Sequence, residues 1–122
     1  MKFKTIIEQK NNLRFHQVSG RLSFEELHDT LQNIYNDKNI DKTLNALWDL
    51  SEADISDFTL DEVEQVANFV AQNWGRVPGT KAAIVVSADY SYGMARMYEI
   101  LLDSLTSNVI RIFAISGPPG TG

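Results

Sequence analysis

The sequence predicts a single α/β domain with a mixed, mostly parallel sheet of about five strands, three main helices and an N-terminal hairpin. Three observations support this prediction. The length of 122 residues suits one domain with one hydrophobic core. Apolar and charged residues make up 43% and 22% of the chain, the balance of an ordinary globular protein. After a first pair of strands, helical and strand-like segments alternate, which is typical of parallel strands joined by crossover helices.

The N-terminal segment is expected to form an antiparallel hairpin. Residues 2–10 and 13–18 each alternate between two sets of side chains, which indicates strands with one face buried. Asn11-Asn12 lies between them and supplies the turn. We expect His16 to pair across this hairpin rather than to act in catalysis.

Three helices are expected, and the first two begin with the same pattern. Ser23 and Glu26, and again Thr59 and Glu62, place a hydroxyl and a carboxylate three residues apart. In such a capping box each side chain satisfies a free backbone amide at the start of the helix. The expected helices run from Ser23 to Asp37, from Thr59 to Gly75, and from Asp89 or Ser91 to Asn108. The expected inward faces are Val63, Val66, Ala67, Val70 and Trp74 on the second helix, and Met94, Met97, Tyr98, Leu101 and Leu105 on the third.

The remaining strands are expected at residues 44–50, 82–86 and 109–115. The first of these is short and mostly apolar, as in a central strand that is covered on both faces. In an open parallel sheet, ligands bind beyond the carboxyl ends of the strands. We therefore expect the functional site at the rim formed by residues 49–58, residues 87–93 and the segment from Ser116.

The composition excludes several classes of function. Lys and Arg number 11 against 16 Asp and Glu, so the formal net charge is −5, and no basic stripe suited to nucleic acid is present. No apolar run approaches the roughly 18 residues that a membrane span needs. The chain has no cysteine, which excludes thiolate catalysis and fits a cytoplasmic protein. We therefore expect neither a nucleic-acid partner nor a membrane span.

Neither a metal site nor a cofactor is expected. The acidic stretch from Glu52 to Glu62 lacks the spacing and the glycine of a calcium loop, and its carboxylates suit a helix N-terminus instead. His16 and His28 lie in no metal-binding or catalytic pattern. Because no nucleophile and base stand out together, the protein is not expected to be an enzyme.

Four residues at the expected rim are candidates for contact with a ligand or partner. Asp49 follows apolar residues, so it either accepts backbone amides of the next loop or contacts a ligand or partner. Tyr92 and Arg96 are four residues apart and share one face of the third helix. Arg96 either holds an anion or pairs with a carboxylate of its own helix. Gly93 costs helix stability, which suggests that a strand or a ligand approaches closely there.

The C-terminal segment Gly117–Gly122 resembles the start of the phosphate-binding loop of AAA-type ATPases. The Lys, the Ser or Thr and the helix that such a loop needs do not follow it. We expect a surface tail at residues 117–122, outside a domain that spans residues 1–116.

Four short strings of the sequence match the pattern of a known family. They are Val18-Ser19-Gly20, Leu47-Trp48-Asp49-Leu50, Gly79-Thr80-Lys81-Ala82-Ala83 and Tyr92-Gly93-Met94-Ala95-Arg96-Met97-Tyr98-Glu99. With them the chain resembles the SpoIIAA-like group of the STAS family (sulfate transporter and anti-sigma-factor antagonist). This resemblance implies a small bacterial α/β domain of STAS-like fold, located in the cytoplasm and without known catalytic residues. Some STAS relatives are interaction switches that are phosphorylated on a Ser after the central strand, and Ser56 is the nearest candidate here. The group also resembles CRAL-TRIO lipid carriers in fold.

The sequence therefore favours a non-catalytic regulatory or protein-interaction module of the STAS type, which meets a protein partner or a second copy. The alternative is a carrier or sensor of a small amphipathic or lipid-like ligand, whose head group Arg96 or Tyr92 would hold. A third interpretation is an enzyme that acts on a small anion through Asp49 and Arg96. The expected lining of a ligand pocket is Phe58, Trp74, Met94 and Met97.

Overall fold

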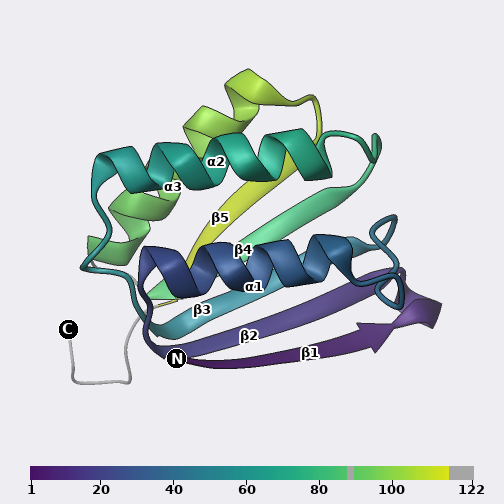
Figure 1. Cartoon of the computed structure of the whole chain (residues 1–122), viewed down its shortest axis with the longest axis horizontal. Helices are drawn as coiled ribbons and strands as arrows, with labels where there is room; N and C mark the ends of the chain where they lie inside the picture. The colour runs from purple at the N-terminus through teal and green to yellow at the C-terminus, as the bar shows by residue number, and fades with distance from the viewer. Residues whose placement is uncertain (88–89, 116–122) are drawn as a thin grey trace.

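The computed structural model describes residues 1–87 and 90–115, which form a five-stranded sheet and three helices (Figure 1). The strands lie in the order β1-β2-β3-β4-β5, with β1 antiparallel to β2 and the other neighbours parallel. This confirms the predicted α/β class with a mixed sheet and an N-terminal hairpin. The strands are β1 (Lys2–Glu8), β2 (Leu13–Arg21), β3 (Asn45–Asp54), β4 (Lys81–Ser87) and β5 (Val109–Ile115). The helices are η1 (Gln9–Asn11, a 3-10 turn), α1 (Phe24–Asn36), α2 (Leu60–Trp74) and α3 (Tyr90–Leu105).

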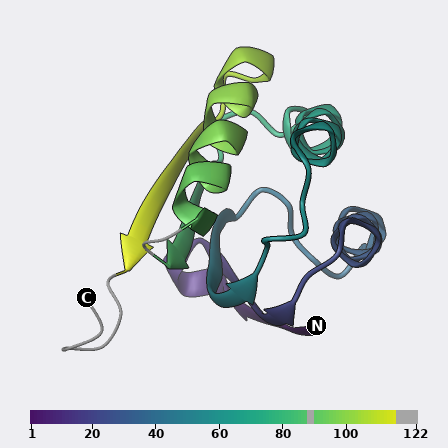
Figure 2. The ribbon, with the colours of Figure 1, turned by 90° about the vertical axis from the view of Figure 1, so that its left-hand side faces the viewer.

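All three main helices lie on one side of the sheet (Figures 1 and 2). Each crossover leads to the next strand in the same direction, so a single hand of crossover places every helix on the same face. We call the other face the open face; Phe15, Leu47, Val85 and Phe113 lie on it. The prediction that residues 44–50 are covered on both faces is therefore wrong: Leu47 and Asp49 are partly exposed on the open face.

The helix-facing side of the sheet carries the core. Even-numbered residues of β2, of β4 and of β5 point toward the helices, as the buried Val18, Val86 and Ile110 indicate. The predicted inward face of α2 is confirmed, because all five of its expected residues are buried. Its start is also as predicted: Thr59 and Glu62 form both hydrogen bonds of the capping box.

The buried face of α3 differs from the prediction. Met97 and Leu105 are 37% and 47% exposed, whereas Ala95 and Leu102 are buried. The physical reason is that apolar side chains occur around most of this helix, so their spacing does not select one face. Packing against both α2 and β5 selects it instead.

The end of β3 also differs from the prediction. β3 continues through Asp54, four residues past the predicted end at Leu50, because β2 is long enough to pair with it there. Residues 51–54, which were expected in the rim after the strand, are therefore part of β3. The predicted cap at Asp89 and the Gly117–Gly122 tail lie outside the described residues.

Candidate ligand-binding site

The predicted rim is only partly assembled. β3 and β4 do run side by side, with Asp49 opposite Val85. Asp49, however, lies in the middle of β3 and on the open face. Its Oδ1 accepts hydrogen bonds from the Ser51 backbone N–H at 3.0 Å and the Ser51 hydroxyl at 2.6 Å. Asp49 was expected either to accept nearby backbone amides or to contact a ligand or partner, and these hydrogen bonds agree with the first interpretation.

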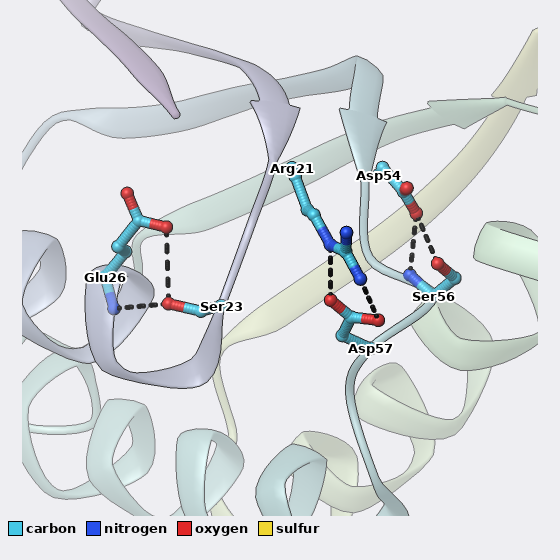
Figure 3. A network of polar contacts seen from close by, with 6 residues as sticks. All are labelled: Arg21, Ser23, Glu26, Asp54, Ser56 and Asp57. Carbon is cyan, nitrogen blue, oxygen red and sulfur yellow. Dashed lines mark hydrogen bonds and ion pairs between the residues drawn. The ribbon is translucent and has the colours of Figure 1, made fainter.

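Ser56 lies in a network of polar contacts after β3 (Figure 3). Its backbone N–H and its hydroxyl donate to Asp54 Oδ1 at 3.0 and 2.6 Å. Beside it, Arg21 donates two hydrogen bonds to Asp57, at 2.6 and 3.0 Å (Figure 3). Both side chains of this pair are well exposed, so water screens their attraction. The network orders the loop between β3 and α2.

The remaining candidates lie on the exposed side of α3. Arg96 pairs with Glu99, a buried carboxylate three residues later in the chain. This agrees with the second of its two expected roles, pairing with a carboxylate of its own helix. Tyr92 is 39% exposed. Within the described part of the chain, a methyl group added at Gly93 would meet no atom within 4 Å apart from the backbone of its own helix, so no described strand approaches it closely. The structure therefore does not gather Asp49, Ser56 and the α3 residues into one cavity.

A cavity does exist elsewhere, between the sheet and the helices, and we call it the pocket. Its volume is about 130 Å³ and its walls are almost wholly apolar. All three helices and strands β2 to β5 contribute to it. Of the four residues expected to line a ligand pocket, Met97 is absent because it points to solvent. The other three do line it: Phe58, Trp74 and Met94.

Arg14 is the charged residue in the lining of the pocket. It lies on β2 opposite Ala46 of β3, at the amino end of the parallel strands and so away from the predicted rim. The residue is only 2% exposed. Its Nη1 donates a hydrogen bond to His16 Nε2 at 2.9 Å, and the Tyr35 hydroxyl interacts with its guanidinium. Burial lowers the pKa of Arg14, while the Tyr35 contact opposes that shift. A guanidinium remains charged even so.

His16 is the hydrogen-bond acceptor that holds the Arg14 guanidinium. It is fully buried, pairs with Thr5 across the hairpin as predicted, and lies against the Trp48 ring at a centroid distance of 4.4 Å. Because Arg14 can only donate, His16 Nε2 must accept, and Nδ1–H then donates to the Thr5 hydroxyl at 2.8 Å. Burial, aided by the Arg14 charge, lowers the pKa of His16 to about 3. The imidazole is therefore neutral at physiological pH.

Two tyrosines complete the polar part of the pocket. Tyr35 comes from α1 and Tyr98 from α3, and both line the pocket. Burial raises the pKa of Tyr35 against the opposing effect of Arg14, and burial raises that of Tyr98 well above its usual range. Both hydroxyls are thus protonated at neutral pH and able to donate a hydrogen bond.

The fold and the pocket define an α/β domain with an apolar pocket that contains one buried cation. None of the described helices is both long enough and apolar enough to cross a membrane. No family model matches the chain, and comparisons with curated proteins and with solved structures find no match.

Proposed function

We propose that this protein is a non-catalytic module that carries or senses a small amphipathic molecule, held in the pocket between the sheet and the helices. The volume of about 130 Å³ is the single observation that carries the proposal. A dry apolar cavity of about 150 Å³ is large enough to bind benzene. The apolar part of the ligand is therefore about the size of one aromatic ring or a short alkyl chain.

The energetic cost of the pocket favours a ligand over a packing defect. Empty volume in a core costs about 24 cal/mol per Å³. An enclosed, empty cavity of about 130 Å³ would cost about 3 kcal/mol, which is the upper limit for this partly open pocket and a large part of the 5–15 kcal/mol that stabilises an ordinary domain. A bound apolar molecule would restore the lost contacts and recover much of this free energy.

The test compares two neighbouring alanines of β4. Ala82 lines the pocket, whereas Ala83 is the next residue and points to the open face. We expect the wild-type protein to bind toluene in an NMR titration, Ala82→Leu to weaken binding at least tenfold, and Ala83→Leu to leave it unchanged. Circular dichroism confirms that each variant is folded. If toluene and 1-hexanol both fail to bind the wild-type protein up to their solubility limits, the proposal is wrong.

A second candidate function is the regulatory or protein-interaction module of the STAS type, located in the cytoplasm and acting through a second copy of the chain. The exposed edge strand β5 favours it. Val109, Phe113 and Ile115 of β5 are 39%, 54% and 49% exposed on the open face, and no described strand pairs beyond β5. An antiparallel β5–β5 pair centred on Ile112 would set Val109 opposite Ile115, and Arg111 opposite the Phe113 ring.

Native mass spectrometry tests this second candidate. We expect a concentration-dependent dimer that Phe113→Lys abolishes, because the new charge would face Arg111 of the other copy. Ile6→Lys is the matched control, since Ile6 is an exposed apolar residue on β1 at the opposite edge of the sheet. A wild-type protein that stays monomeric at high concentration would exclude self-association through β5.

A further inference from the structure

The buried guanidinium of Arg14 has no directly paired counter-ion among the residues that the structure describes. Among the described residues, no carboxylate lies within ion-pairing distance of it, and its Nε is a buried nitrogen without any hydrogen-bond partner. The negative charge of Asp41 interacts electrostatically with the Arg14 guanidinium and raises its pKa. The Asp41 carboxylate is already held by the Thr43 backbone N–H at 2.9 Å and by Gln9 at 3.2 Å. A buried charge that is not directly paired with an opposite charge is costly, so an anion bound beside Arg14 would stabilise it.

The free donors of Arg14 suit a planar anion. Nη1 is occupied by His16, which leaves Nε as the donor with no partner. A guanidinium binds a carboxylate side-on through neighbouring N–H groups, with two parallel hydrogen bonds. The Tyr35 hydroxyl interacts with Arg14 and keeps its own proton, so it can donate to the same anion.

From these contacts we infer that the ligand of the pocket is a small monocarboxylate, with its carboxylate on Arg14 and Tyr35 and an apolar body in the rest of the pocket. This inference rests on the proposed ligand-binding function and adds the chemical class of the ligand. One negative charge neutralises the one buried positive charge. A phosphate or phosphonate dianion would leave an excess charge among apolar walls, so it should bind more weakly.

The test compares ligands of one shape that differ in charge. Benzoate, benzyl alcohol and phenylphosphonate are titrated into the protein at pH 7.4 by NMR and calorimetry. Because a hydrogen bond to a charged group is worth more than a neutral one, we expect benzoate to bind at least tenfold more tightly than benzyl alcohol and than phenylphosphonate.

Variants then assign this preference to the two residues. Arg14→Met should weaken benzoate binding at least tenfold and change benzyl alcohol binding less than threefold. Tyr35→Phe retains the ring and should weaken benzoate binding severalfold; it also keeps the inference testable if Arg14→Met does not fold. Arg111→Met, which removes an exposed arginine of the open face, is the matched control and should change nothing.

The outcomes separate the inference from the function on which it rests. If benzyl alcohol binds as tightly as benzoate, or if Arg14→Met and Tyr35→Phe keep the preference, the carboxylate inference is wrong and the pocket remains a neutral ligand site. If phenylphosphonate binds most tightly, the anion class is wrong. If neither toluene nor any of the three compounds binds, the proposed function itself is wrong.

Discussion

Neutral His16 makes the stability of the fold depend on pH. Its pKa is about 3 in the folded protein against about 6.5 in an unfolded chain. Between these values the unfolded chain binds a proton that the folded protein does not. Stability therefore falls as the pH falls below about 6.5, and it stops falling on this account below about 3.

The expected loss can be worked out for a convenient range. From pH 7 to pH 5 the unfolded histidine goes from about one-quarter protonated to almost fully protonated, while folded His16 stays neutral. The linked free energy is about 2 kcal/mol. His16 is fully buried, so solvent does not reduce this value. The carboxylates with lowered pKa, Asp41, Asp54 and Asp57, contribute only below about pH 4, outside the chosen range.

Urea unfolding at pH 7, 6 and 5 and constant ionic strength measures this loss. We expect the wild-type free energy of unfolding to drop by about 2 kcal/mol between pH 7 and 5. In His16→Gln, whose amide can also accept from Arg14 and donate to Thr5, the drop should be below about 0.5 kcal/mol. His28→Gln, which removes the other histidine, should behave like the wild type. Equal pH dependence in wild type and His16→Gln would refute the reasoning.

Four smaller effects are expected in urea unfolding at pH 7. Gly93→Ala should stabilise by about 0.5–1 kcal/mol, since alanine favours a helix and meets no atom there; Gly79→Ala should destabilise, because Gly79 has a φ of +85°. A loss of stability in Gly93→Ala would show that Gly93 is needed. Arg21→Ala should lower the stability only slightly, and the effect should vanish in 1 M salt, because the pair with Asp57 is exposed. Thr59→Ala should cost about 1 kcal/mol through the lost cap; no change would mean that water replaces it.

The parts of the fold that sequence reasoning predicted well are those determined by nearby residues. Helix α2 is an example: its cap, its apolar stripe and its end at Gly75 all lie within one segment, and each was predicted. The antiparallel pairing of the hairpin is similar, because its two strands are adjacent in the chain. The expectation that one face of residues 2–10 is buried is wrong: β1 ends at Glu8, and its residues are mostly exposed because it is an edge strand that the described helices leave largely uncovered. Alternation of helices and strands then sufficed for the sheet class.

The site could not be predicted because it depends on contacts between distant segments. The pocket exists only because large side chains of three helices and four strands leave space between the layers. Arg14 and His16 alternate with Leu13 and Phe15, and this pattern alone does not say which set is buried. One signal was available: Arg14 and His16 share their strand face with Val18, a core residue. Arg96, one of the expected anchors on α3, pairs with Glu99 of its own helix and does not line the pocket.

The sequential order of the strands also has a consequence for synthesis on the ribosome. Each new strand joins the outer edge of the strands already made, and none must be inserted between two partners that are already paired. Since domains are synthesised from the N-terminus, the emerging chain can assemble its sheet in the order of translation, one strand and one helix at a time.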